Sequence, residues 1–124
     1  MRHLLSAGIG AILFLSCNAA DAADIRRGAR LFQQHCALCH SAVHAGPENF
    51  GPNLFDVVGR KPGTVPGFAY SAAMKAVDIP WSPARLESYI AAPTAIIPGV
   101  RMRYVGPADR EARSDLVGYL VTLR

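Results

Sequence analysis

A chain of 124 residues with a formal net charge of +4 is long enough for one small domain. The positive charge is modest and spread along the chain, so it suits an acidic partner surface and does not indicate nucleic-acid binding. A domain of this size buries little apolar surface. We therefore expect a disulfide, a metal or a cofactor to contribute to its stability.

The first 22 residues have the composition of a secretory signal peptide. A short basic start precedes an apolar run over residues 4–16, and small residues rich in alanine follow. Ala20 and Ala22 fit the A-x-A rule, so we predict cleavage after Ala22. The prediction is a signal peptide over residues 1–22 and one domain over residues 23–124.

Two other fates of the amino-terminal segment stay open. Cys17 follows Phe14-Leu15-Ser16, which loosely resembles a lipoprotein cleavage site, and an uncleaved segment would act as a membrane anchor. The apolar run is short for a membrane span. Cleavage would remove Cys17 and leave only Cys36 and Cys39, in an oxidising compartment where they could form a disulfide.

Helical spacing recurs along the rest of the chain, and no alternating strand pattern appears. We predict an all-α domain of four or five helices. Ser82 and Pro83 mark one helix start, as N-cap and first helical residue, and Pro93 marks its end. The expected helices and one helical turn cover residues 24–39, 53–58, 71–76, 82–92 and 108–123. Long Gly- and Pro-rich loops over 41–52, 59–67 and 96–106 are unusual in a small domain, unless they surround a large apolar cofactor.

Residues 36–40 read Cys-Ala-Leu-Cys-His, the C-x-x-C-H pattern of c-type haem attachment. Two thiols at this spacing reach the two vinyl groups of one porphyrin, and the adjacent imidazole suits iron. A thioredoxin-like redox pair, half of a zinc site and a plain disulfide are the alternatives. The redox pair requires a βαβ setting, and zinc requires two more ligands. His35 and His44 are available but not at paired spacing.

Two methionines, Met74 and Met102, follow the signal peptide and are candidates for a second axial ligand. Met102 lies in a loop stiffened by Pro98, whereas a methionine that fills a core more often lies on a helix face. From the residues alone, iron ligation and core packing both remain open for Met102.

Over residues 24–124 the chain resembles the class I cytochrome c family, of the mitochondrial and short bacterial type. C-x-x-C-H alone is shared by many unrelated haem proteins, so the ordered set of landmarks is what makes the resemblance specific. After the motif these landmarks are GPNL (51–54), GRKPG (59–63), PGFAYS (66–71), Trp81, IPGVRM (97–102) and DLVGYL (115–120). The resemblance implies the cytochrome c fold, with helices and long loops wrapped around one covalent haem c.

The resemblance also implies the ligands. The haem is attached through Cys36 and Cys39, and His40 and Met102 bind the iron from opposite sides. The carbonyl of Pro52 accepts a hydrogen bond from the His40 imidazole, which orients the ligand.

Other roles implied by the resemblance concern the surroundings of the haem and the packing of the helices. Arg60, Tyr70 and Trp81 are expected near the propionates, and Tyr89 is expected to hydrogen-bond near the Met102 sulfur. The first helix is expected to cross the last, with Gly28 and Phe32 against Leu116 and Tyr119.

The surface that meets a partner departs from the mitochondrial pattern. Thr94 and Ala95 replace lysines beside the docking face, and Tyr104 stands where Phe usually covers the haem edge. Cleavage after Ala22 leaves two lysines and ten arginines. We expect a docking patch with an aromatic centre and a few arginines, Arg101 and Arg103 among them.

The function implied by the resemblance is electron transfer, not enzyme catalysis, because His/Met ligation leaves no open position for a substrate. We expect a monomeric periplasmic shuttle with respiratory or photosynthetic redox partners. Its expected partners are a membrane cytochrome complex, oxidase, reductase or dehydrogenase, and no nucleic acid. The alternatives are a dedicated cytochrome subunit of a periplasmic dehydrogenase and a haem sensor or peroxidase-like enzyme with a labile sixth position.

Overall fold

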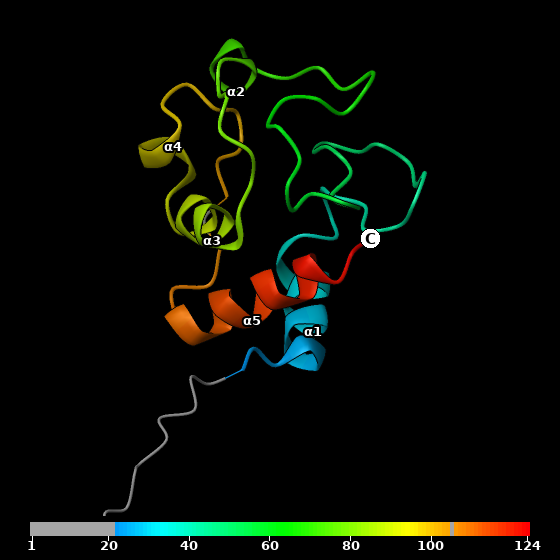
Figure 1. Cartoon of the computed structure of the whole chain (residues 1–124), viewed down its shortest axis with the longest axis vertical. Helices are drawn as coiled ribbons and strands as arrows, with labels where there is room; N and C mark the ends of the chain where they lie inside the picture. The colour runs from blue at the N-terminus through cyan, green and yellow to red at the C-terminus, as the bar shows by residue number, and fades with distance from the viewer. Residues whose placement is uncertain (1–21, 105) are drawn as a thin grey trace, which may run out of the picture.

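The computed structural model describes residues 22–104 and 106–124, so all but the last residue of the predicted signal peptide lies outside the described residues. The described part contains five helices and no strand, which confirms the all-α prediction. In chain order they are α1 (Ile25–His35), α2 (Ala72–Lys75), α3 (Pro83–Ala91), α4 (Pro93–Ile96) and α5 (Arg110–Val121) (Figure 1). None of these helices has the length and apolar character needed to cross a membrane.

Helix α1 begins at a capping aspartate and ends just before the C-x-x-C-H motif. The Asp24 carboxylate accepts a hydrogen bond from the Arg27 N–H at 2.9 Å, which satisfies one of the free donors of the first turn. The predicted helix ran to residue 39, but α1 ends at His35 and the motif forms tight turns. The N–H groups of Cys39 and His40 both donate to the Cys36 carbonyl. The spacing of apolar residues could not show where the helix ends, because consecutive tight turns place side chains at a similar spacing.

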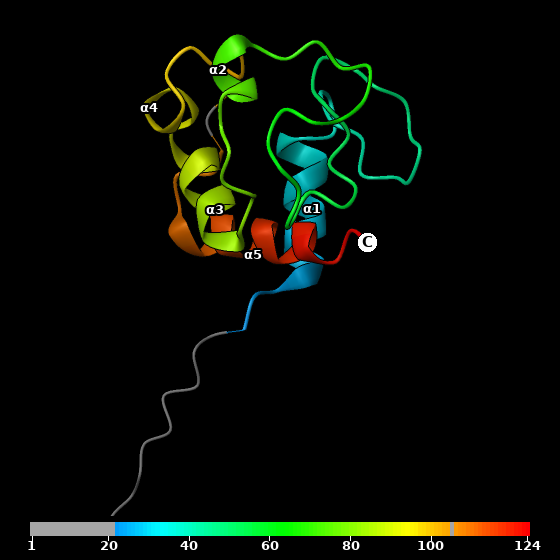
Figure 2. The ribbon, with the colours of Figure 1, turned by 45° about the horizontal axis from the view of Figure 1, so that its top comes forward.

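Helices α1 and α5 cross at one end of the molecule (Figure 2). A Cβ on Gly28 would lie 2.9 Å from the Cβ of Tyr119, so only glycine allows this approach. The rings of Phe32 and Tyr119 lie 5.5 Å apart, inclined by 57°, and Leu116 is fully buried. The predicted packing of the first helix on the last is therefore confirmed.

Among the shorter helices, the sequence predicted the bounds of α3 but not the presence of α4. Ser82 caps α3 by accepting from the Arg85 N–H at 3.1 Å, and α3 ends before Pro93, as predicted. Pro93 also starts α4, which was not predicted. Proline tolerates the first position of a helix, so it ends one helix and begins the next.

The helical turn predicted over residues 53–58 is wrong. The side chain of Asn53 accepts a hydrogen bond from the Phe55 N–H at 2.8 Å, and Asp56 has a φ of 58°. A side-chain turn of this kind competes with helix formation, and a left-handed residue interrupts it.

The long loops contribute to the core and do not merely cover it. The buried apolar cluster joins α1, α3 and α5 through Phe32, Leu86 and Leu116, and loop residues Val57 and Trp81 complete it. In Figure 1 the loop between α1 and α2 fills the side of the molecule away from α3 and α4. Because the core depends on these loops, whatever orders them stabilises the whole fold.

Candidate functional site

The C-x-x-C-H motif lies in the turns that follow α1. The thiols of Cys36 and Cys39 are half-buried and are not joined in a disulfide. Burial raises the pKa of Cys36 to about 11, with a smaller contribution from the neighbouring Cys39. Among the described residues no cluster of three or more histidine, cysteine and acidic side chains forms a metal site, so the zinc alternative gains no support.

His40 is held by the loop that carries the GPNL sequence. Its Nδ1 donates to the carbonyl oxygen of Pro52 at 2.7 Å. Because a carbonyl only accepts, Nδ1 carries the hydrogen, and the lone pair of a neutral imidazole then lies on Nε2. Burial lowers the pKa of His40, while the hydrogen bond to Pro52 acts in the opposite direction. A neutral, oriented imidazole is what a metal requires from a histidine ligand.

Gly51 has a role that the sequence analysis missed. A Cβ at this position would lie 2.7 Å from Nδ1 and 2.8 Å from Nε2 of His40, so a larger residue would displace the ring. The Gly51 N–H donates to the Cys39 carbonyl at 2.8 Å, which holds the loop against the motif. The sequence marks Gly51 only as a landmark, because nothing in residue spacing shows which ring it faces.

The two candidate methionines occupy different environments. Met74, on α2, is 9% exposed and belongs to the buried core. Met102 is half-buried, lies in the loop between α4 and α5, and packs against the edge of that core. Met74 is therefore the methionine that fills the core, and Met102 remains the predicted ligand.

The loop around Met102 is attached on both sides. Before it, Arg101 Nη1 donates to the carbonyl of Ala69 at 2.7 Å. After it, the hydroxyl of Tyr104 and Nδ1 of His35 are hydrogen-bonded, and their rings lie 5.9 Å apart. His35 directly precedes Cys36, so this contact brings the loop to the motif.

Arg60 binds backbone oxygens of the preceding turn. Its Nη1 and Nη2 donate to the carbonyls of Phe55 and Asn53, each at 2.9 Å. These two bonds use two of the five N–H groups of a guanidinium, and no ion pair joins Arg60 to a described carboxylate. Burial lowers the pKa of Arg60, and the nearby Tyr70 opposes this shift. The remaining N–H groups are suited to an anionic group.

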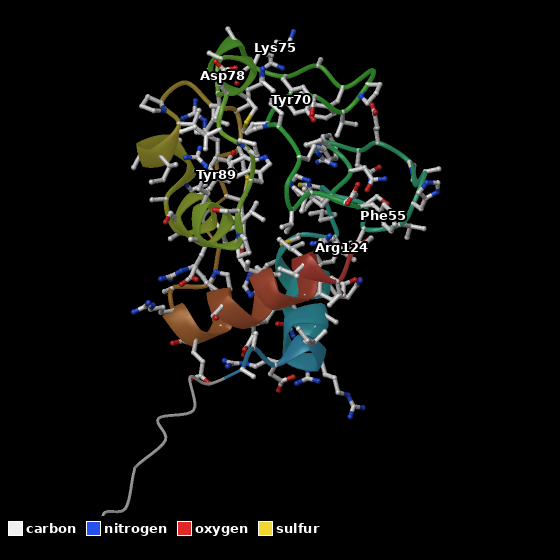
Figure 3. All side chains as sticks on the ribbon, in the orientation of Figure 1. Phe55, Tyr70, Lys75, Asp78, Tyr89 and Arg124 are labelled. Atoms are coloured by element: carbon white, nitrogen blue, oxygen red, sulfur yellow. The ribbon has the colours of Figure 1, made fainter. Side chains whose placement is uncertain are left out.

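Tyr70, Trp81 and Tyr89 come from different elements. The Tyr70 hydroxyl accepts from the Val65 N–H at 3.1 Å, and burial raises the pKa of Tyr70. Trp81 is linked to Arg60 through its backbone, since the Trp81 N–H donates to the Arg60 carbonyl at 2.9 Å. Figure 3 shows Tyr70 on the loop before α2 and Tyr89 on α3.

Tyr89 packs on Trp81 with ring centres 5.1 Å apart. Burial raises the pKa of Tyr89 to about 12, which keeps its hydroxyl protonated. In residues 22–104 and 106–124, no hydrogen bond joins this hydroxyl to Met102, so the contact expected there is not seen and the role of Tyr89 stays a prediction.

Comparison with known proteins decides the family. Residues 23–120 match the family model described as "Cytochrome C oxidase, cbb3-type, subunit III". A cytochrome c2 from Rhodomicrobium vannielii is 37% identical over 122 residues, which cover 98% of this chain and 97% of the relative. A cytochrome c2 from Rhodopila globiformis is 41% identical over 105 residues, 85% of this chain and 98% of the relative. A cytochrome c from Chlamydomonas reinhardtii is 41% identical over 101 residues, covering 82% and 90%.

The chain belongs to the class I cytochrome c family. This cytochrome is thus an electron-transfer protein and not an enzyme, as the sequence predicted, and its family implies a covalently bound haem c. The residues present fit that group. Two unpaired thiols and a histidine with Nε2 available lie within residues 36–40, and Gly51 leaves room for the imidazole ring in this orientation.

Proposed function

We propose that this cytochrome is a periplasmic monohaem electron carrier with its haem attached through Cys36 and Cys39 and its iron bound by His40 and Met102. The single observation that carries the proposal is the hydrogen bond from His40 Nδ1 to the Pro52 carbonyl. It leaves Nε2 available and holds the ring in one orientation beside the two thiols. The haem supplies one-electron chemistry through its iron.

The other site residues adjust the environment of the iron. A thioether is a soft ligand that favours ferrous iron, so Met102 raises the reduction potential. Arg60 has N–H groups left for a propionate, and its contacts with the loop keep its guanidinium in place. We expect Tyr70 and Trp81 to lie on the propionate side and Tyr89 to hydrogen-bond near the Met102 sulfur.

The location and partners are the next part of the proposal. Cleavage after Ala22 releases residues 23–124 into the periplasm as a monomer, and no lipid is attached at Cys17. The cytochrome takes an electron from a membrane cytochrome complex or a dehydrogenase. It passes the electron to an oxidase, a reductase or a photosynthetic centre.

A second candidate is a fixed cytochrome subunit of a larger redox enzyme. Its support is the matching family model, whose description names a subunit of an oxidase. The two candidates differ in purification: a carrier elutes alone at the size of one chain, and a subunit elutes with its enzyme. The relatives named cytochrome c2 favour the carrier.

Ligand replacement in the holoprotein tests the proposed site. Met102→Ala is expected to lower the midpoint potential, abolish the sulfur-to-iron charge-transfer band of the ferric form and let carbon monoxide bind the ferrous form. Met74→Leu is the matched control, because it keeps core volume and is expected to change none of these properties. A normal potential and no carbon monoxide binding in Met102→Ala would remove Met102 from the proposal.

A further inference from the structure

The segment between α4 and α5 carries Met102 but forms no regular element among its described residues. Long-range hydrogen bonds attach this segment to the rest of the fold. Arg101 is bonded to the Ala69 carbonyl before Met102, and the Gly106 N–H donates to the Ile90 carbonyl at 2.8 Å after it. Between these two attachments, Tyr104 reaches across to His35.

The His35–Tyr104 contact differs from the other two attachments in what it joins. Arg101 and Gly106 connect the loop to Ala69 and Ile90, which both come well after the C-x-x-C-H motif in the sequence. Tyr104 connects it to the last residue of α1, 69 positions earlier and directly before Cys36. Tyr104 lies two residues after Met102, the proposed sulfur ligand. His35 lies next to Cys36, the proposed site of a thioether bond.

We propose that His35 is a positioning residue, which holds the Met102 loop closed through the hydroxyl of Tyr104 and so slows displacement of the sulfur by external ligands. The inference rests on the proposed function, because it requires Met102 to bind the iron. Tyr104 is 45% exposed, so this hydrogen bond competes with water and contributes modestly. We expect its loss to speed loop opening by about three- to tenfold.

Packing of the two rings is the competing explanation, and two substitutions separate it from hydrogen bonding. Tyr104→Phe keeps the ring and removes only the hydroxyl. His35→Asn places an amide where Nδ1 stands and keeps a hydrogen-bonding group within reach of Tyr104. If packing alone held the loop, Tyr104→Phe would behave as wild type.

The test measures how fast imidazole binds the ferric holoprotein, since Met102 has to leave before imidazole can bind. We expect faster binding in His35→Leu and Tyr104→Phe, no further increase in the double variant, and near wild-type binding in His35→Asn. His44→Leu is the control, because His44 is an exposed histidine that packs on Phe55 and not on the loop. It is expected to bind imidazole at the wild-type rate.

The outcomes separate this inference from the proposed function. If the wild type has the sulfur-to-iron band but Tyr104→Phe and His35→Leu bind imidazole at its rate, the positioning role is wrong and the ligand assignment stands. Additive effects in the double variant also contradict it, since two residues of one hydrogen bond should not act independently. A wild type without the band overturns the ligand assignment and this inference together.

Discussion

Gly51 lies so close to His40 that a Cβ on it would come within 2.7 Å of the ring nitrogen Nδ1. The carbonyl of the next residue, Pro52, accepts the hydrogen of the same nitrogen at 2.7 Å. Two consecutive residues therefore determine both the position of the imidazole and the nitrogen that carries its hydrogen. The proposed ligand is oriented by the protein itself.

Gly51→Ala is expected to destabilise the holoprotein by about 1–3 kcal/mol, because the added methyl group has no space beside His40. In a domain of this size each kcal/mol lowers Tm by about 4–8 °C. Thermal melts and ferric spectra are the measurements. Gly59→Ala is the control: it has open space around its Cβ, so it strains the backbone at a φ of +87° without touching His40. A wild-type melt and spectrum for Gly51→Ala would show that the ring is not confined there.

Cys36→Ala combined with Cys39→Ala is expected to leave a largely unfolded chain. Loop residues such as Val57 and Trp81 form part of the core, and a cofactor that binds only the folded state stabilises it by linkage. Circular dichroism during heating is the measurement. A cooperative, native-like melt without haem would mean that the loops order themselves.

Asp115→Asn is expected to weaken the junction of α1 and α5. This buried carboxylate accepts from the Asp24 N–H at 2.7 Å and from Arg27 at 3.0 Å. Since Arg27 is more than a third exposed, solvent screens part of the pair, and the expected loss is about 2 kcal/mol. Urea unfolding measures it. Glu111→Gln is the control, because the exposed carboxylate of Glu111 lies 3.8 Å from the same arginine. Its loss is expected to lower the free energy of unfolding by less than about 0.5 kcal/mol.

Arg103→Glu is expected to slow electron transfer with the native partner and to change its dependence on salt. From the sequence, Arg101 and Arg103 were expected to have the same role in docking. In the structure Arg101 also holds the loop through Ala69, whereas no hydrogen bond or ion pair joins Arg103 to another described residue. A substitution of Arg103 therefore tests docking without disturbing the hydrogen bond between Arg101 and Ala69. With few charges around the patch, we expect a shallow salt dependence.

Stopped-flow oxidation across a salt series compares wild type with Arg103→Glu. Arg101→Gln is the matched variant, because it removes a charge and weakens the attachment to Ala69 at the same time. Equal rates for wild type and Arg103→Glu at low salt would place the docking face elsewhere.

The mature chain is expected to begin at Ala23. The first residues of the proposed mature chain contact α5: a Cβ on Gly118 would meet the Cβ of Ala23, and the Asp24 N–H donates to the buried Asp115. The mass of the exported holoprotein measures the cleavage point, and Cys17→Ala is expected to leave that mass unchanged. A mass that includes a lipid, lost in Cys17→Ala, would favour the lipoprotein alternative.

Several features could be predicted because they depend on neighbouring residues. C-x-x-C-H brings its thiols and imidazole together within five positions, and Ser82 with Pro83 starts α3 through contacts inside one turn. The all-α class follows from the same local periodicity, which the structure confirms.

Other features depend on residues that meet only after folding. The sequence indicated a helix through residue 39, yet α1 ends at His35, where Tyr104 from a distant loop binds it. Gly51 carries no sign of its role until His40 lies against it. By itself, the sequence determined the family, the chemical groups of the site, and the helices that are capped by the residues directly before them. Tertiary structure alone decided the close approach of Gly51 to His40 and the attachment of the Met102 loop, because both depend on contacts between segments that residue spacing does not relate.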